Sequence, residues 1–289
     1  MGYNLSTSAA DGADPAADGA DPAADAREVE ALGFDFVSMS DHLHGDHPTF
    51  ETWTLLTWVA AATSRVRLVT NVLGLPYRPA AVLAKMAESL HRLSGGRLVV
   101  GLGAGGNDAE FSAFGLETGS PREKVAALEE AMAAMRALWA RPGVDVVGEH
   151  VRLKGATITP RPPAPVPLWL GAYGPRMLEL VGRAADGWLP SMPFAPPERM
   201  RDLGSRVRRA AEAAGRDPDA ITYAYNVGVH VGRRQQGRPV VSGAADEVVS
   251  GLRALVHELH LDAVNIWPSG DERRQRAALG DVLPALRAA

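Results

Sequence analysis

Short apolar segments typical of β-strands alternate with amphipathic helical segments along nearly the whole chain. Several of the apolar segments are hydrophobic at consecutive positions, as expected for strands of a parallel sheet covered on both faces. Eight of them are each followed by a helical segment, which favours a single-domain (β/α)8 TIM barrel over residues 1–289. The expected strands are Gly2–Ser6, Phe36–Ser40, Arg67–Val72, Leu98–Gly103, Leu168–Ala172, Gly187–Leu189, Thr222–Val231 and Ala263–Trp267.

Between the expected strands, apolar residues recur at helical spacing. Four side chains of Pro79–Leu93 form one apolar stripe, namely Val82, Met86, Leu90 and Leu93. Pro121–Trp139 begins with a proline and repeats this pattern, as amphipathic helices do. The segment Asp145–Leu153 instead predicts a short hairpin, inserted after the fourth helix.

An acidic heptad is repeated near the N-terminus. Residues Asp11–Ala17 (DGADPAA) recur letter for letter as Asp18–Ala24, and Asp25 begins a third, broken copy. Such a composition buries little apolar area, so a flexible acidic insertion is predicted at about residues 11–25. The insertion lies between the first strand and the first helix, on the side where a barrel carries its active site.

The composition excludes several classes of protein. Apolar residues make up 46% of the chain and the formal net charge is −4, which does not suggest a nucleic-acid or membrane-surface binder. There is no cysteine, so disulfides, thiolate nucleophiles and cysteine-ligated metals are excluded. No run of about 18 apolar residues and no secretory signal pattern occur. A cytoplasmic enzyme is therefore expected.

The segment Ser40–His47 (SDHLHGDH) holds three histidines and two aspartates directly after the second expected strand. A metal site needs three or four converging ligands, and this spacing matches no established metal motif. A histidine at a strand end suits general acid–base catalysis, because histidine titrates near neutral pH. His42 is the predicted acid–base residue, and Asp41 is expected to orient it, to tune its pKa or to contact the cofactor ring. His44 and His47 either face solvent or contact the substrate.

Two glycine-rich segments lie at the ends of later strands. Gly101–Gly106 (GLGAGG) fits the dinucleotide-binding pattern G-x-G-x-x-G, but no amphipathic helix follows it until Pro121. Its glycines either form a structural turn or let a cofactor approach the backbone closely. Leu170–Leu180 (LGAYGPRMLEL) is either an ordinary strand-to-helix turn or a phosphate site built from backbone N–H groups, to which Arg176 would add charge.

Four blocks of the sequence resemble, in order, the luciferase-like monooxygenase superfamily of flavin- and deazaflavin-dependent enzymes. They are EALGFDFVSMSDH, RLVTNVLGLPYRPAAVLAKMAESLHRLSGGRLVVGLGAGG, VPLWLGAYGPRMLELVGRAADGW and DEVVSGLRALV. The segments GYNLS, SDH and LVTNVL are most similar to the branch that uses the deazaflavin coenzyme F420, above all to F420-dependent glucose-6-phosphate dehydrogenases. The resemblance implies a bacterial-luciferase-like barrel, commonly dimeric, with oxidoreductase activity.

The resemblance also implies roles for individual residues. Asp41 and His42 match a paired Asp–His, in which the aspartate lies near the deazaflavin and the histidine near the reacting carbon. Asn71 and Val72 match a bulge with a non-prolyl cis peptide bond that backs the cofactor ring. Two further cofactor-binding turns are implied, a glycine loop after the fourth strand and a phosphate-binding turn after the fifth. They comprise Ala104, Gly105 and Gly106, and Ala172, Tyr173 and Gly174.

The sequence departs from the sugar-phosphate dehydrogenases of this branch. Gly106 stands where those enzymes have an acid, and Glu110 lies four residues further on. The tryptophan that caps their substrate pocket after the Asp–His pair has no counterpart, and His44 and His47 occupy that loop instead. Glucose 6-phosphate is therefore not the expected substrate, and His44 and His47 are the predicted substrate-binding residues.

The sequence thus predicts an F420-dependent oxidoreductase that transfers a hydride between the cofactor and a small organic substrate, with His42 as acid–base residue. An FMN-dependent monooxygenase that uses reduced flavin and O2 is the alternative. A barrel that stores or senses a flavin without catalysis is a third hypothesis. No metal, nucleic-acid or membrane partner is expected, whereas a homodimer is.

Overall fold

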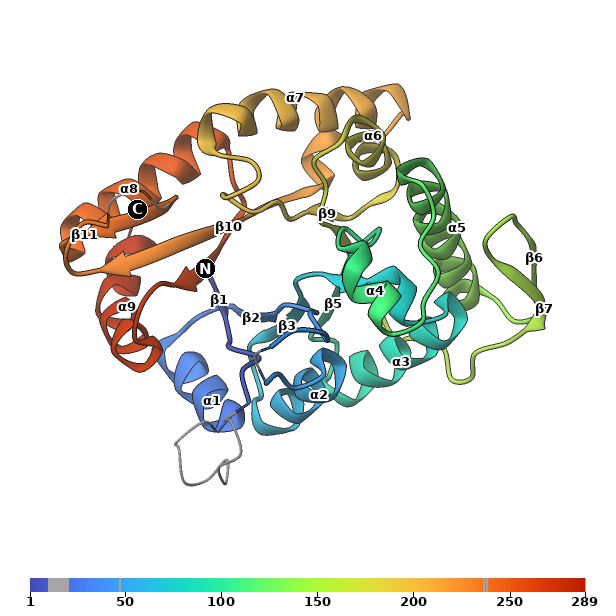
Figure 1. Ribbon diagram of the computed structural model, residues 1–289, viewed down its shortest axis with the longest axis horizontal. Coiled ribbons are helices and arrows are strands. Elements are labelled where there is room, and N and C mark those ends of the chain that lie inside the picture. The colour runs from blue at the N-terminus through green and yellow to red at the C-terminus, as the bar shows by residue number, and fades with distance from the viewer. Residues whose placement is uncertain (10–20, 47, 236, 238, 289) are drawn as a thin grey trace.

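The computed structural model describes residues 1–9, 21–46, 48–235, 237 and 239–288. Within these residues, eight parallel strands form a closed ring, because β9 pairs with both β8 and β10. The ring strands are β1 (Gly2–Asn4), β2 (Phe36–Met39), β3 (Arg67–Thr70), β5 (Leu98–Gly103), β8 (Leu168–Leu170), β9 (Gly187–Trp188), β10 (Thr222–Val231) and β12 (Ala263–Pro268). Figure 1 shows these strands in the centre with helices around them. The predicted (β/α)8 barrel is confirmed.

A helix on the outside of the ring follows each of these strands. The helices are α1 (Pro22–Leu32), α2 (Thr52–Ala62), α3 (Ala80–Leu93), α5 (Pro121–Ala140), α6 (Pro175–Ala184), α7 (Pro197–Ala213), α8 (Ala245–Leu259) and α9 (Glu272–Arg287). The hairpin predicted after the fourth of them is also present, as β6 (Val144–Val147) and β7 (Arg152–Ala156). In Figure 1 it projects from the barrel beside α5.

Several short elements were not predicted. They are β4 (Leu73–Gly74), the 3-10 turns η1 (Leu75–Tyr77) and η2 (Pro218–Ala220), α4 (Asp108–Ala113), and β11 (Val240–Gly243), which pairs with β10 outside the ring. Each is too short to show a hydrophobic period of its own, which is the signal that sequence-based prediction uses. Three of them, β4, η1 and α4, lie at the carboxyl ends of β3 and β5 and shape the candidate site.

The structure describes the acidic repeat only from residue 21 onward. Residues 10–20 lie outside the described part of the chain, so the predicted insertion is described only from Asp21 onward. There it is helical rather than flexible, since α1 begins at Pro22 within the second heptad. Asp21 caps this helix by accepting from the N–H groups of Ala23 and Ala24, and Asp25 pairs with the buried Arg276 of α9. Asp and Pro at a helix start are favourable, which explains why the repeat enters the helix.

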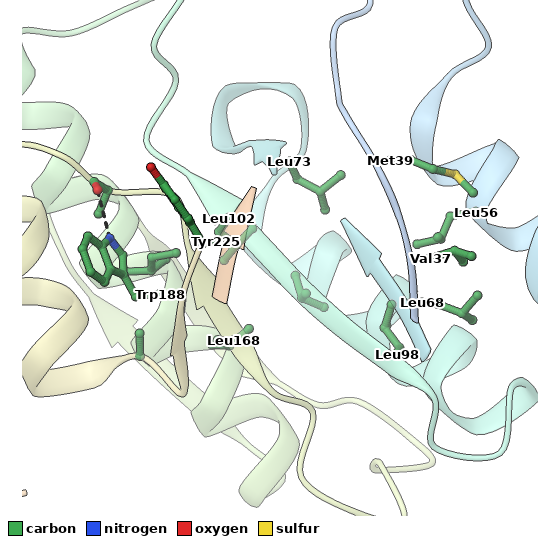
Figure 2. Packing of buried hydrophobic residues seen from close by; sticks show 14 of the residues in the cluster. Val37, Met39, Leu56, Leu68, Leu73, Leu98, Leu102, Leu168, Trp188 and Tyr225 are labelled. Carbon is green, nitrogen blue, oxygen red and sulfur yellow. Dashed lines mark hydrogen bonds between the residues drawn. The ribbon is translucent and has the colours of Figure 1, made fainter. Parts of the chain in front are cut away.

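The hydrophobic core has two parts. Inside the ring, inward-facing side chains pack against one another, namely Phe36, Val69, Val99, Trp169, Leu189 and Ala224. Outward-facing strand residues pack against the helices, as Figure 2 shows for Val37 and Leu68 beside Leu56 of α2. Burying one such aliphatic side chain contributes about 1.5–3 kcal/mol. This packing fixes the strand ends, and with them the polar loops that follow.

Only part of the apolar stripe on α3 faces the barrel. Of its four residues, Leu90 is 3% exposed, whereas Val82 is 53% and Leu93 82% exposed. The face that packs on the strands carries Leu83 and Ala87 instead. Alanines at other buried positions let α3 approach the ring closely, and Val82 and Leu93 remain on the outer surface.

A buried histidine lies at the opposite end of the barrel from the strand ends. His91, in the last turn of α3, is 2% exposed and both its ring nitrogens are buried. Burial lowers the pKa of His91, and the nearby guanidinium of Arg67 lowers it further. Below the ordinary histidine value of 6.5, the unfolded chain therefore binds a proton that the folded chain does not. The free energy of unfolding falls as pH drops through this range.

Replacing His91 by leucine should flatten the pH dependence of stability, because leucine takes up no proton in the unfolded chain. Urea unfolding at about pH 7.5 and about pH 5 should show a larger loss of free energy for the wild type than for His91→Leu. His257→Leu, a change of the same kind at an exposed position of α8, should keep the wild-type difference. Equal slopes for His91→Leu and wild type would contradict the assignment.

Candidate active site

A cavity of about 640 Å³ lies at the carboxyl ends of the ring strands. Among the described residues predicted to contact a cofactor or substrate there, all line it except His44. They are Asp41, His42, Asn71, Val72, Ala104, Gly105, Gly106, Ala172, Tyr173 and Gly174. Segments that follow β2, β3, β5 and β8 are therefore brought to one place, as the barrel architecture requires. Phe111, Phe194 and Trp267 add aromatic wall to the same cavity.

Three strand glycines make room for the end of β3. An added Cβ would lie 2.9 Å from Val72 Cγ2 at Gly103 and 3.2 Å from it at Gly171. At Gly101 it would lie 1.9 Å from the carbonyl oxygen of Thr70. Two glycines of the GLGAGG segment thus serve close packing of the chain rather than phosphate binding. They allow Asn71 and Val72 to form the inner end of the cavity, which we term the cavity floor.

The cavity floor is tied to distant strands through side-chain amides. The Asn71–Val72 peptide bond is cis, as the resemblance implies. The Asn71 amide pairs reciprocally with that of Asn226 in β10, with both N···O distances at 3.0 Å. Asn226 also donates to Ser191 Oγ (2.9 Å) and accepts from Asn265 Nδ2 of β12 (2.7 Å). The floor is thus held by residues that follow or belong to three other ring strands.

Asp41 is committed to an ion pair. Its side chain is fully buried, and its two carboxylate oxygens accept from Arg78 Nη1 at 2.8 Å and Nη2 at 3.1 Å. The N–H of Gly74 in β4 donates to the same carboxylate at 3.0 Å. Arg78 also pairs with Glu51, which caps α2. Asp41 therefore joins the loop after β2 to the loop after β3, and the expectation that it orients His42 is wrong.

The partner of His42 is Glu110. His42 Nδ1 lies 2.9 Å from Glu110 Oε1, and a carboxylate only accepts hydrogen bonds. The Nδ1 atom therefore carries the proton, which leaves Nε2 as the acceptor. The His42 side chain is 66% exposed while that of Glu110 is 10% exposed. A reactive imidazole at the cavity edge is thus oriented by a largely buried acid.

Sequence reasoning left Glu110 without a role because it lies beyond the position of the expected acid. The intervening residues begin α4, and Glu110 is its third residue. This short helix turns the carboxylate back toward the loop after β2. An acid was sought at the end of the glycine loop, at Gly106. An acid within one helical turn after that loop would have pointed to Glu110.

The turn between β8 and α6 presents backbone N–H groups at a helix start. Gly174 is the N-cap residue of α6 and makes no side-chain cap, and Pro175 follows it in the first turn. An added Cβ at Gly174 or Gly106 would meet no atom within 4 Å, so both positions leave open space. Such a helix start attracts anions. Among the described residues that line the cavity there is no lysine or arginine, so a bound phosphate would depend on these N–H groups.

His44, one of the two histidines predicted to bind substrate, does not share the position of His42. The ring of His44 packs edge-on against Phe114, with centroids 6.1 Å apart, and it is not among the residues that line the cavity. Phe114 in turn packs edge-on against Tyr77, at 6.2 Å. His47 lies outside the described residues. His44 thus packs on the aromatic side chain at the end of α4 rather than in the cavity.

The other chemistries considered for these segments find no support in the described part of the chain. No group of three or more His, Asp or Glu residues in it could hold a metal ion. The glycine loop of Gly101–Gly106 is followed by the six-residue α4 in a closed barrel, whereas a dinucleotide fingerprint opens a longer helix in an open sheet.

Comparison with known proteins identifies the family. The family model described as luciferase-like monooxygenase matches residues 1–260. The chain belongs to the luciferase-like monooxygenase family. Within it, an F420-dependent glucose-6-phosphate dehydrogenase of Kineococcus radiotolerans is 37% identical over 204 residues, which cover 68% of this chain and 59% of the relative.

Other members of the family are similar to the same extent. A phthiodiolone/phenolphthiodiolone dimycocerosates ketoreductase of Mycobacterium tuberculosis is 37% identical over 211 residues, 71% of this chain and 53% of the relative. The chain thus spans little more than half the length of these curated relatives. Among solved structures, an F420-dependent secondary alcohol dehydrogenase with an F420–acetone adduct superposes with a TM-score of 0.86 at 20% identity, covering 99% of this chain and 98% of that one.

Monooxygenases of the family share the fold as well. A long-chain alkane monooxygenase superposes with a TM-score of 0.80 at 13% identity, covering 92% of this chain and 83% of that one. At these identities the structural matches establish the fold alone. In the residues that the structure describes, no helix has the length and apolar character needed to cross a membrane.

Removing the guanidinium from Asp41 should destabilise the fold. Arg78→Met leaves a buried carboxylate without its cation, which costs about 3–5 kcal/mol. Urea unfolding measures this loss. Arg273→Met, a matched change at an exposed site of α9, should cost less than about 0.5 kcal/mol. The double variant Arg78→Met/Asp41→Leu should recover part of the loss, and an additive further loss would contradict the ion-pair account.

Proposed function

We propose that this chain is an F420-dependent oxidoreductase that transfers a hydride between the deazaflavin and the oxygen-bearing carbon of a small organic substrate. The His42–Glu110 pair at the edge of the cavity is the observation that carries the proposal. Relatives at 37% identity that are named as an F420-dependent dehydrogenase and as a ketoreductase support it. Both names describe the interconversion of a carbon–oxygen single bond and a carbonyl.

The cavity suits the cofactor by size and chemistry. Its volume of about 640 Å³ lies within the range of small-molecule sites. Asn71 and Val72 would support one face of the ring, and Ala104–Gly106 would lie along its edge. The Ala172–Gly174 turn would hold the phosphate through backbone N–H groups. When bound, F420 supplies or accepts the hydride at its central ring, and the protein contributes binding, orientation and proton transfer.

His42 is the proposed acid–base residue. With Nδ1–H donated to Glu110, Nε2 is free to accept the hydroxyl proton of an alcohol as it becomes a carbonyl. In the reverse direction the same nitrogen returns the proton to the developing alkoxide. The carboxylate of Glu110 stabilises the imidazolium that forms. Asp41 pairs with Arg78 and holds the loops after β2 and β3 together. It takes no part in proton transfer.

The cavity walls favour an uncharged substrate. The cavity residues that the structure describes include no lysine or arginine, and the acid Glu110 adds negative charge beside His42. A phosphorylated sugar would find no side-chain cation there. Phe111, Phe194 and Trp267 offer apolar surface instead. An uncharged alcohol or carbonyl compound is therefore the proposed substrate class.

A titration with both cofactors tests the cofactor assignment. F420 should bind with a dissociation constant at least tenfold lower than that of FMN, measured by the fluorescence of each cofactor on addition of protein. Gly174→Val should weaken F420 binding, because a branched side chain at the start of α6 crowds the backbone N–H groups. The backbone φ of −81° at Gly174 is open to any residue, and thermal unfolding of Gly174→Val checks that the fold is kept. Equal failure of both cofactors would contradict the proposal.

An FMN-dependent monooxygenase is the second candidate function. The match of residues 1–260 to the luciferase-like monooxygenase family favours it. Tighter binding of FMN than of F420, with oxygen consumption in the presence of reduced flavin, would establish this alternative. Light emission is not expected.

Loss of His42 should abolish turnover while leaving cofactor binding intact. In His42→Ala, kcat should fall by about 10²–10⁴-fold, the usual contribution of general acid–base catalysis. The dissociation constant of F420 should change little, because the ring is held by backbone and apolar groups. His257→Ala, on the exposed face of α8, should retain wild-type kcat. Binding without any effect of His42→Ala would instead indicate a barrel that stores or senses the cofactor.

We also propose that two copies of the chain associate through α2. This helix (TWTLLTWVAAA) has no charged residue, although it lies on the outside of the barrel. A groove of about 700 Å³ lies between it and α3, and another of about 880 Å³ lies along its other side. Trp53 and Thr57 line both, so α2 is a ridge between two grooves. Trp58, Val82 and Leu93 are exposed there, and the ridge of one copy would pack into a groove of the other.

Charges placed on this surface should prevent association. Trp58→Asp/Leu93→Asp should sediment as a 30.6 kDa monomer at concentrations where the wild type sediments as a dimer. Val147→Asp, at a 95% exposed position of the hairpin, should leave the wild-type sedimentation unchanged. A wild type that is monomeric at micromolar concentration, or a dimer that persists in the double variant, would contradict the proposal.

A further inference from the structure

Both carboxylate oxygens of Glu110 are held by groups other than His42. Asn107 Nδ2 donates to Oε1 at 2.7 Å, the same oxygen that lies 2.9 Å from His42 Nδ1. The hydroxyl of Tyr77 donates to Oε2 at 3.3 Å. The carboxylate is thus fixed in rotation about its last bond as well as in position. Neither Tyr77 nor Asn107 was identified from the sequence.

The side chain of Asn107 makes a hydrogen bond to Glu110 and does not cap α4. It is the N-cap residue of α4, a position where asparagine normally accepts from the backbone N–H groups of the first turn. Here it makes no such cap. A side-chain cap would stabilise the first turn of α4, so its absence at a residue suited to provide it indicates that the amide serves the carboxylate.

Tyr77 is fixed by close packing. Its ring lies 4.7 Å from that of Phe111. A Cβ at Gly74 would come within 3.0 Å of Phe111 and 3.1 Å of Tyr77, so a glycine at this position lets η1 and α4 meet. Burial and the neighbouring Glu110 carboxylate raise the pKa of Tyr77 to about 12. The hydroxyl therefore keeps its proton and remains a donor across the physiological range.

We propose that Tyr77 and Asn107 are positioning residues that clamp Glu110, so that His42 is held with its proton on Nδ1 and with Nε2 facing the substrate. This rests on the proposed function, in which His42 transfers the proton. Free imidazole favours the opposite tautomer, with the proton on Nε2, and in proteins the hydrogen bond of one ring nitrogen decides which nitrogen is protonated. A carboxylate that rotates away would let His42 return to the unproductive form.

The two variants that test this remove one donor each and preserve the packing. Tyr77→Phe keeps the ring against Phe111. Asn107→Ser removes the amide while supplying a good N-cap residue for α4, so a purely structural role of Asn107 predicts no loss. Tyr223→Phe is the matched control, because the Tyr223 hydroxyl is buried with no hydrogen-bond partner and lies next to β9 at the far end of the ring.

The readout is the tautomer of His42 in the cofactor-free protein, taken from ¹⁵N–¹H correlations of the histidine rings. The His42 signals are those that disappear in His42→Asn. The wild type and Tyr223→Phe should show Nδ1–H, and Tyr77→Phe and Asn107→Ser should shift toward Nε2–H. With F420 and an alcohol substrate, each of the two variants should lose kcat on the order of tenfold, the worth of a hydrogen bond to a charged group, with KM within about twofold.

Unchanged tautomers in both variants, or a kcat within about twofold of wild type, would overturn the proposal. A failure of the proposed function is a different result, because wild type would then show no turnover with F420. The tautomer comparison needs neither cofactor nor substrate and decides the positioning role in that case as well.

Discussion

The reciprocal amide pair between Asn71 and Asn226 is the interaction on which the candidate site depends. Inside a barrel, polar groups without partners are costly, so buried amides are stabilised by the hydrogen bonds that they make to one another. Here each amide satisfies the other, and Asn265 and Ser191 extend the pairing to the neighbouring strands. The end of β3 is therefore fixed from across the ring. A floor held in this way keeps its shape irrespective of movements in the loops above it.

The two acids near this floor have different functions because they have different partners. Asp41 is buried with the guanidinium of Arg78, which also pairs with Glu51, and these ion pairs join two loops. Glu110 has a histidine as its partner, and its other contacts come from an amide and a hydroxyl. Of these two acids, only Glu110 has no lysine or arginine partner among the described residues. Its Oε1 atom, 2.9 Å from His42 Nδ1, orients the imidazole at the cavity edge.

The barrel was predictable because its signal extends over many residues. Strands buried on both faces require consecutive apolar residues, and closed packing leaves few alternatives once eight of them alternate with helices. Strand ends predicted which segments meet at the cavity, and the family resemblance pointed to Asn71 and Gly174, both of which line it. The hydrogen-bond partner of His42 could not be predicted in this way. Whether Asp41 or Glu110 contacts His42 depends on α4, six residues that are too few for a hydrophobic period.

The same limit explains the surface of α3. A stripe of Val82, Met86, Leu90 and Leu93 has helical spacing, but spacing alone does not say which partner the stripe faces. Leu90 is buried with Leu83 and with alanines of α3, which permit a close approach to the strands. Val82 and Leu93 are left outside, beside a helix α2 that has no charge.

The absence of cations among the described cavity residues limits what the site can select. In the proposed function, backbone N–H groups at a helix start would bind the cofactor phosphate and would need no lysine. A phosphate on the substrate would then find no cationic side chain among the described cavity residues and would lie near Glu110. Repulsion and desolvation would both oppose its binding. Under this proposal, selection against anionic substrates follows from how the cofactor phosphate is held, and needs no residue dedicated to that purpose.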